Sequence, residues 1–215
     1  MRLGIFGGTF NPIHFGHLRA AEEVCDLMRL ERLFFIPAAR PPHKDPGGVT
    51  PFALRYEMTR LAVADDPRLE VSDLENRRPD KSYSIDTLRL LRQEYGPTAQ
   101  LFFVLGLDAM LEIDSWKSYR DLFNLCHFLV LDRPGYERQH LHALLASRVD
   151  PRCEYLPAEE AYRHPSGTFI YLRQTTLLDI SSTQIRRLVR AGRSIRYLLP
   201  EEVRRFIIKN KLYLS

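Results

Sequence analysis

The chain has 215 residues, 45% of them hydrophobic and 27% charged, which suits one sizeable globular domain and is slightly short for two. The 31 Lys and Arg residues exceed the 27 Asp and Glu residues by a modest margin, which is compatible with a nucleic-acid binder or a nucleotide enzyme but is usually just a solvated face and so decides little. No apolar stretch approaches the length that crosses a membrane, so a membrane protein is not expected. The 3 cysteines lack a Cys-x-x-Cys pattern, which favours buried thiols in a reducing compartment.

Strand and helix signals alternate from the start of the chain, and Met1–Gly8 indicates a first strand rather than a signal peptide. In chain order we expect a strand at Leu3–Phe6, a helix at His14–Leu30, a strand at Leu33–Ile36, a loop at Ala38–Thr50, a helix at Phe52–Val63, a strand at Leu69–Ser72, a helix at Tyr83–Tyr95, a strand at Leu101–Leu105, a helical region at Ala109–Leu125, a strand at Phe128–Leu131, a helix at Leu141–Ser147, weaker strands at Cys153–Leu156 and Phe169–Leu172, and helices at Ser182–Ala191 and Glu201–Asn210.

Strands separated by helices of this length predict βαβ units and a mostly parallel sheet. We therefore expect an α/β fold: one Rossmann-like, doubly wound domain over residues 1–215, with a small C-terminal helical part at about 180–215. Ligands of such sheets bind at the carboxyl ends of the strands, near the switch in strand order. The loops that follow the strands, and the late loop before Ser182, are therefore the places to look for a site.

The loop after the first strand has the features of a phosphate site. Gly7 and Gly8 lack side chains, so that a ligand could approach the backbone closely. The order Gly-x-Gly-x-x-Gly of dinucleotide-binding proteins is missing, and no Gly-Lys-Ser/Thr of a Walker loop follows. A nicotinamide-cofactor dehydrogenase is therefore disfavoured in spite of the fold.

Two histidines, His14 and His17, stand three residues apart at the start of the first predicted helix and so share a face. The apolar stripe of that helix, extended backwards, reaches both, which points their rings into the ligand crevice. Free N–H groups and the helix dipole favour phosphate there, and we expect the imidazoles to donate hydrogen bonds to phosphate oxygens. Two zinc ligands are an alternative, but no third ligand with suitable spacing follows.

The late segment Ile180–Arg186 combines a capped helix with an anion site. Ser181 is a good N-cap residue and Gln184 stands three positions on, so a purely structural role is possible. The hydroxyls of Ser182 and Thr183 lie beside free N–H groups, and Arg186 follows one turn later, within reach of the same phosphate.

Both segments together resemble one family. The run from Gly7 to His17 is similar to the signature of the nucleotidyltransferase superfamily with a His-x-Gly-His motif, above all to bacterial nicotinate mononucleotide adenylyltransferases, which often have an acidic residue in place of Asn11. The segment Ile180–Arg186 matches that family's Ile-Ser-Ser-Thr-x-Ile-Arg pattern, whereas the Lys-Met-Ser-Lys-Ser motif of the related aminoacyl-tRNA synthetases is absent. The resemblance implies that Lys44, in the loop after the second strand, closes on the triphosphate.

Further segments resemble the part of that family that selects the pyridine nucleotide: Lys81–Thr87, Gly106–Asp108 and Trp116. The helix that begins at the first of them offers backbone N–H groups to a pyridine carboxylate. The resemblance implies that Trp116 stacks on the pyridine while the N–H of Lys117 meets the carboxylate, although a lone Trp is more often a core residue. Asp108 would accept hydrogen bonds from a ribose, and Arg133 would lie near the adenine or the ribose.

The resemblance thus implies adenylyl transfer from ATP to nicotinate mononucleotide, with Mg²⁺ bridging the phosphates, in a cytoplasmic protein of undecided oligomeric state. Its catalytic residues would be His14, His17, Lys44 and Arg186. ATP would be bound by Gly7, Gly8, Thr9, His14, His17, Gly106, Asp108, Arg133, Ile180, Ser182, Thr183 and Arg186. The mononucleotide would be bound by Phe10, Tyr83, Ser84, Ile85, Thr87, Trp116 and Lys117. Nicotinamide mononucleotide or phosphopantetheine as the acceptor, and a non-catalytic nucleotide or RNA binder, are the alternatives; neither nucleic acid nor membrane is expected as a partner.

Overall fold

The computed structural model describes residues 1–41, 48–132 and 138–214. Its strands follow the order β3-β2-β1-β4-β5-β8-β7-β6. They are β1 (Arg2–Gly8), β2 (Arg32–Pro37), β3 (Leu69–Val71), β4 (Gln100–Gly106), β5 (His127–Leu131), β6 (Glu154–Leu156), β7 (Ala161–Arg163) and β8 (Phe169–Arg173). Parallel pairing joins β1 to β4, β4 to β5, β5 to β8 and β2 to β3, whereas β7 is antiparallel to both β6 and β8. The expected α/β fold with a mostly parallel sheet is therefore confirmed.

The chain forms two compact units, which are described separately. Unit 1 comprises Met1–Gly7 and Tyr83–Thr175, and unit 2 comprises Gly8–Ser82 and Thr176–Ser215. The two helices of the predicted C-terminal part, α7 (Ser182–Arg190) and α8 (Glu201–Lys209), belong to unit 2 together with α1 (Phe15–Met28) and α2 (Phe52–Ala62). Residues 8–17 of the glycine–histidine segment and the Ile180–Arg186 segment therefore lie in one unit.

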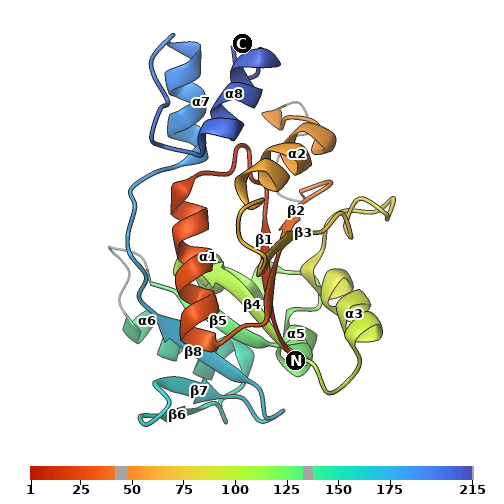
Figure 1. The fold of residues 1–215 in the computed structure, drawn as a ribbon. Helices are drawn as coiled ribbons and strands as arrows, with labels where there is room; N and C mark the ends of the chain where they lie inside the picture. The colour runs from red at the N-terminus through yellow and green to blue at the C-terminus, as the bar shows by residue number, and fades with distance from the viewer. Residues whose placement is uncertain (42–47, 133–137, 215) are drawn as a thin grey trace. The chain divides into compact units, whose positions relative to one another are not determined.

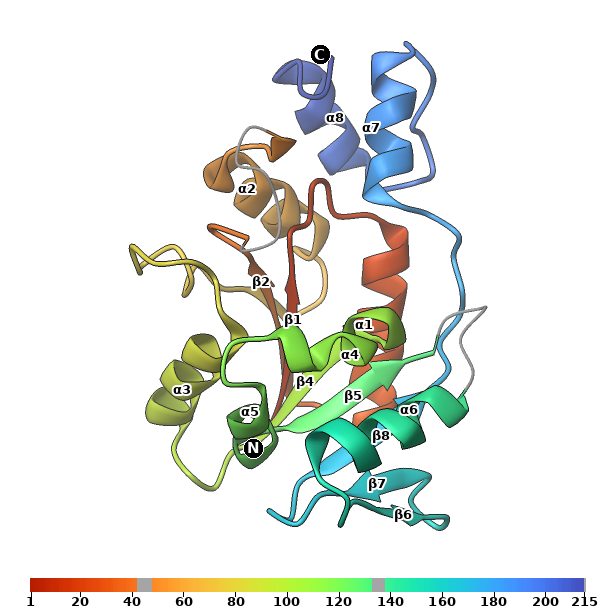
Figure 2. The ribbon, with the colours of Figure 1, turned by 180° about the vertical axis from the view of Figure 1, so that it is seen from behind.

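Unit 1 is built on the apolar strands β4 and β5, whose side chains at Leu101, Val104 and Leu129 are at most 1% exposed. Burial of a strand on both faces explains why these runs are continuously apolar rather than alternating. In Figure 2, α4 (Leu107–Leu111) lies along β4 and β5, and α6 (Arg138–Leu144) lies next to α4. The remaining helices of the unit are α3 (Ser84–Tyr95) and α5 (Tyr119–Leu125).

Unit 1 differs from the expected elements in two places. The helical region expected at Ala109–Leu125 consists of α4, a 3-10 turn at Ile113–Ser115 and α5. Helix α4 ends where Glu112 leaves the helical region with φ of −103° and ψ of 13°, and the extended Trp116 and the left-handed Ser118, with φ of 50°, separate the 3-10 turn from α5. Strand β7 was not expected at all, because its three residues are too few to show a period of two.

His127, at the start of β5, gives unit 1 a pH-dependent stability. Its Nδ1 accepts a hydrogen bond from the N–H of Phe169 at 3.0 Å, and its ring stacks on Phe102. Burial, with the nearby Arg2 and Arg92, lowers the pKa of His127 to about 4. In the unfolded chain His127 binds a proton near pH 6.5, whereas in the folded chain it stays neutral until about pH 4. The stability that the neutral, buried His127 contributes is therefore complete above about pH 6.5 and is lost as the pH falls towards 4.

We therefore expect the melting temperature to fall between pH 6.5 and 4, and to fall less in a His127→Gln variant. The comparison of the two proteins matters because carboxylates also titrate in this window. Melting curves at half-unit pH steps provide the measurement. Identical pH profiles of wild type and variant would contradict the assignment.

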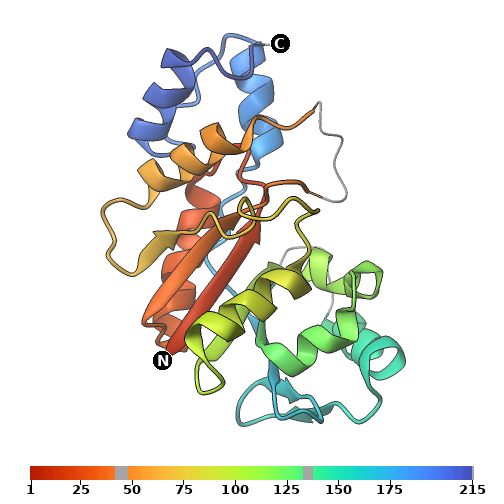
Figure 3. The ribbon, with the colours of Figure 1, turned by 90° about the vertical axis from the view of Figure 1, so that its right-hand side faces the viewer.

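Unit 2 holds α1, which packs its apolar stripe of Ala21, Val24, Cys25 and Met28 inwards. The helix starts one residue later than expected, because His14 is extended and serves as its N-cap. It ends at Met28 rather than at Leu30, because Arg29 turns left-handed with φ of 48°. Figures 1 and 3 show α8 lying beside α2, which brings the end of the described chain close to the start of α2.

Helix α7 has the predicted N-cap and a glycine motif at its C-terminal end. The hydroxyl of Ser181 accepts a hydrogen bond from the N–H of Gln184 at 3.1 Å, as an N-cap residue does. At the other end Gly192 is left-handed, with φ of 62°. The N–H of Gly192 meets the carbonyl of Val189, and the N–H of Arg193 meets that of Leu188, which together form a Schellman motif.

Candidate active site

The loop after β1 packs tightly against its own aromatic residue. A Cβ on Gly8 would lie 2.7 Å from the ring of Phe10, so no side chain fits there unless that ring moves. Phe10 is 2% exposed, has φ of 46°, and meets the rings of His17 and Phe35 edge-on at 5.1 and 5.5 Å between centroids. Phe10 was expected to touch the mononucleotide; its ring is instead buried within unit 2, and that role stays a prediction.

The two histidines lie together at the mouth of α1. Their rings stack with centroids 3.7 Å apart, and His14 is buried, whereas His17 is half-buried. The carbonyl of His14 accepts from the N–H groups of His17 and Leu18, so α1 begins directly at this residue. Gly16 lies between the two histidines in the sequence, and a Cβ there would approach the His14 ring to 3.1 Å. A larger residue in place of Gly16 would therefore press against the ring of His14, which explains why the motif has a glycine at this position.

The hydrogen bond of His17 determines its tautomer. Its Nδ1 accepts from the backbone N–H of His14 at 3.3 Å. An imidazole that accepts through Nδ1 carries its proton on Nε2 when neutral. His17 is therefore set to donate from Nε2, at a helix N-terminus where N–H groups and the macrodipole favour an anion.

Helix α7 is joined directly to the glycine–histidine loop. The hydroxyl of Ser182 donates to the carbonyl of Pro12 at 2.7 Å, and Nη1 of Arg186 donates to the carbonyl of Asn11 at 2.8 Å. Arg186 Nη2 reaches the hydroxyl of Thr183 at 3.2 Å. The structure thus brings together the two segments that the sequence singled out, although 170 residues separate Ser182 from Pro12. The hydroxyl proton of Ser182 is therefore already engaged in a hydrogen bond within the protein.

A buried arginine that the sequence analysis missed supports the same loop from behind. Arg55, on α2, is 1% exposed and donates three hydrogen bonds of 2.7 Å to backbone carbonyls. Its acceptors are Thr9, Ala38 and Thr50. The N–H of Ala38 in turn donates to the carbonyl of Gly8 at 2.8 Å. Arg55 therefore ties the predicted ATP-binding residues Gly8 and Thr9 to the end of β2.

The predicted pyridine-binding residues gather at the start of α3 in unit 1. Ser84 and Ile85 occupy the first turn, whose N–H groups have no acceptor within the helix. The side chains of Ile85 and Thr87 are buried, and the Thr87 hydroxyl donates to the carbonyl of Tyr83 at 3.3 Å. A ligand at this helix end would meet backbone groups rather than these two side chains.

Lys117 and Trp116 lie close to that helix end. Nζ of Lys117 pairs with Asp86 at 2.9 Å and lies 4.7 Å from the centre of the Tyr83 ring. Trp116 is half-buried and places its edge against Phe103, with centroids 6.0 Å apart. In the part of the chain that the structure describes, the backbone N–H of Lys117 meets no protein acceptor. These contacts are consistent with the prediction that Trp116, Lys117 and the start of α3 form one binding site.

Gly106 and Asp108 follow β4 directly. Gly106 is the N-cap of α4 and Asp108 is in its first turn, so both lie at the carboxyl end of a central strand, where α/β sheets bind ligands. Two other predicted residues, Lys44 and Arg133, lie outside the described residues. No group of three or more His, Cys, Asp or Glu side chains is gathered as for a metal ion within residues 1–41, 48–132 and 138–214. Over the same ranges, no helix is long and apolar enough to span a membrane.

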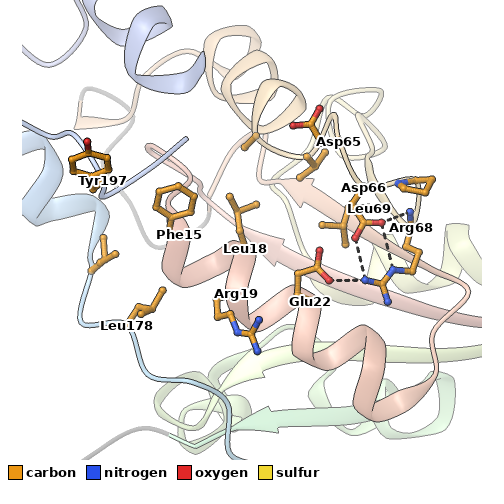
Figure 4. Close-up of a pocket in the computed structure, with 14 residues that line it drawn as sticks. Phe15, Leu18, Arg19, Glu22, Asp65, Asp66, Arg68, Leu69, Leu178 and Tyr197 are labelled. Atoms are coloured by element: carbon orange, nitrogen blue, oxygen red, sulfur yellow. Dashed lines mark hydrogen bonds and ion pairs between the residues drawn. The ribbon is translucent and has the colours of Figure 1, made fainter. Parts of the chain in front are cut away.

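A separate cavity of about 830 Å³ lies in unit 2, along the face of α1 that carries Phe15 and Leu18 (Figure 4). Arg68 crosses its edge and pairs with Glu22 at 2.5 Å and with Asp66 at 3.1 Å. Of the predicted ATP-binding residues that the structure describes, Ile180 alone lines it. The cavity is therefore not the place where the two motifs meet.

A family model described as cytidylyltransferase-like matches residues 5–188, most of the chain and both motifs. A solved structure, "Plasmodium falciparum nicotinic acid mononucleotide adenylyltransferase complexed with NaAD", superposes with a TM-score of 0.75 at 20% identity and covers 99% of this chain and 97% of that one. At this identity the likeness shows the fold. The fold, the motifs and the family model define the class: the chain is a nucleotidyltransferase, and hence an enzyme.

Curated relatives narrow the class. "Probable nicotinate-nucleotide adenylyltransferase" of Geobacter metallireducens is 51% identical over 213 residues, and the protein of the same name from Geotalea daltonii is 50% identical; each match covers 99% of this chain and 98% of the relative. The chain belongs to the nicotinate-nucleotide adenylyltransferase family. The resemblance drawn from the residues is thereby confirmed.

Proposed function

We propose that this enzyme transfers the adenylyl group of ATP to nicotinate mononucleotide, giving nicotinate adenine dinucleotide and pyrophosphate. The observation that carries the proposal is the joining of the His14–His17 pair to α7 through Asn11 and Pro12 in one compact unit. This arrangement gathers neutral and cationic donors, the kind of groups that stabilise the charge of a transferring phosphoryl group. Family membership supports the choice of acceptor.

The proposed reaction is an in-line displacement. A phosphate oxygen of the mononucleotide attacks the α-phosphorus of ATP and forms the new P–O bond while the bond to pyrophosphate breaks. The attacking oxygen is already ionised, so no general base and no covalent intermediate are needed. Catalysis then consists of orientation and of stabilising the charge on the departing oxygens. His17 Nε2 and the guanidinium of Arg186 would donate to those oxygens, and Lys44 would add a charge.

Magnesium belongs to the proposal as a companion of ATP. The donors at the mouth of α1 are imidazole, hydroxyl and guanidinium groups, which suit phosphate oxygens rather than a bare Mg²⁺ ion. The ion would therefore be held mainly by the phosphates and would neutralise their charge there. A cytoplasmic location is part of the same proposal, supported by the free thiols of the buried Cys25 and Cys126.

The preference for a nicotinate over a nicotinamide ring would come from the start of α3. Backbone N–H groups of Ser84, Ile85 and Lys117 can donate to a carboxylate, and the helix end is favourable for its charge. Asp86 lies in the same turn and would repel a carboxylate, but the ammonium of Lys117 pairs with it at 2.9 Å. By neutralising the charge of Asp86, Lys117 would remove this repulsion and leave the helix end favourable for a carboxylate.

A test with three acceptors distinguishes the possible substrates. The protein is incubated with ATP, Mg²⁺ and either nicotinate mononucleotide, nicotinamide mononucleotide or phosphopantetheine, and pyrophosphate release is measured. We expect rapid release with the nicotinate compound and release at least tenfold slower with the nicotinamide compound, because an amide cannot use all the donors of the helix end. Absence of release with all three would refute the reaction. Equal rates with the two pyridine nucleotides would refute only the carboxylate site.

A further inference from the structure

The end of unit 2 returns to the glycine–histidine loop. The hydroxyl of Tyr213 donates to Oδ1 of Asn11 at 2.9 Å, a contact between residues 202 positions apart. Asn11 is 4% exposed, so its amide oxygen has little access to water. The backbone carbonyl of the same residue accepts from Arg186 at 2.8 Å. Asn11 is thus held through its backbone by a predicted catalytic residue and through its side chain by Tyr213.

Tyr213 is itself held rigidly. It follows α8 in a left-handed conformation with φ of 63°, and the N–H of the preceding Leu212 donates to the carbonyl of Ile207 at 3.0 Å. Its hydroxyl is also 4.0 Å from the sulfur of Met58. Burial raises the pKa of Tyr213 to about 12, although a hydrogen bond with Thr50 and the charges of Arg186 and Arg55 act in the opposite direction. The hydroxyl therefore remains a donor throughout the physiological pH range.

We propose that Tyr213 is a positioning residue, which holds Asn11 and thereby sets the loop from Gly8 to His14 in the shape that binds phosphate. Without the hydroxyl, a buried amide oxygen loses its donor, and the side chain of Asn11 can satisfy itself only by moving. Such a movement would displace His14, three residues further on, and with it the N-terminus of α1. The consequence for activity rests on the function proposed above, whereas the consequence for the shape of the loop does not.

The variant Tyr213→Phe removes only the hydroxyl. We expect its kcat to fall on the order of tenfold with the KM for ATP within about a factor of two, because a displaced donor weakens the transition state more than initial binding. A second variant, Ile207→Val, removes one buried methylene from α8 and lowers the melting temperature modestly, while the backbone carbonyl that accepts from Leu212 is kept. It should keep the wild-type kcat. Tyr197→Phe is a further control, since Tyr197 is 82% exposed.

Hydrogen exchange measured by mass spectrometry tests the inference without relying on turnover. Peptides covering residues 8–17 should exchange faster in Tyr213→Phe than in wild type, and should be unchanged in Ile207→Val and Tyr197→Phe. Wild-type kinetics together with wild-type exchange in Tyr213→Phe would overturn the proposal. So would equal effects in Tyr213→Phe and Ile207→Val, because lost stability would then explain both. If wild type releases no pyrophosphate but the loop exchange still separates the variants, the proposed function fails and the positioning role stands.

Discussion

Replacing His17 by alanine is expected to lower kcat about a thousandfold while leaving the melting temperature close to that of wild type. His17 is half-buried at the mouth of α1, and its Nδ1 accepts from the N–H of His14, so its Nε2 is the atom that can donate to a phosphate oxygen. Loss of one such donor costs roughly a hundredfold to a thousandfold in kcat. Because the ring also stacks on His14 at 3.7 Å, its loss should misplace the second imidazole too, and we expect the upper end of that range.

Pyrophosphate release and a circular dichroism melt of the same preparations provide the measurement. His140→Ala is the matched control, because His140 is an exposed histidine on a helix, α6, and should keep full activity. A His17→Ala protein that melts much earlier than wild type would indicate a structural histidine. A protein that melts normally and turns over within tenfold of wild type would refute a catalytic role.

The largest loss of stability is expected for Arg55→Met. The change removes a buried guanidinium and leaves the carbonyls of Thr9, Ala38 and Thr50 without these donors. A buried polar group that loses its partner costs about 1–3 kcal/mol, so the free energy of unfolding should drop by about 3–5 kcal/mol once the loops relax. Although burial lowers the pKa of Arg55, an arginine remains charged at neutral pH, so the substitution also removes a charge from the interior.

Urea denaturation of Arg55→Met and Arg60→Met gives the comparison. Arg60 lies on the same helix, pairs with Glu57 on the surface and should be replaceable with little change in the midpoint. Activity of Arg55→Met below its melting temperature should also be reduced, since the variant frees Thr9 in the predicted ATP loop. Equal midpoints for the two variants would show that the three carbonyl contacts contribute little.

The residues most readily predicted from the sequence were those whose signal is local. His14, Gly16 and His17 lie within one turn of each other, and Ser181 caps α7 through a residue three positions on. Short spacings of this kind can be recognised before any fold is known. The alternation of strands and helices likewise predicted that most strands of the sheet are parallel, because each βαβ unit is continuous in the chain.

The residues that were missed act over long distances in sequence. Arg55 lies in an ordinary helical pattern, where a charged residue normally marks the exposed face. Its burial depends on carbonyls 5, 17 and 46 residues away, which no local pattern reveals. Tyr213 is a similar case, because its role needs Asn11, 202 residues away. The interruption between α4 and α5 is different: it lies in the backbone angles of Glu112, Trp116 and Ser118, which a count of helical spacing does not register.

The contacts around Asn11 and Pro12 have a consequence for the order of events during synthesis. The bonds that join the glycine–histidine loop to Ser182, Arg186 and Tyr213 span 170, 175 and 202 residues, so the loop is synthesised well before the groups that hold it. At about 5–20 residues per second, the loop waits on the order of ten seconds or more for these partners. A nascent chain that stops before residue 182 therefore contains both histidines but none of the three groups that hold their loop, and the loop cannot make its full set of observed contacts until residue 213 has been made.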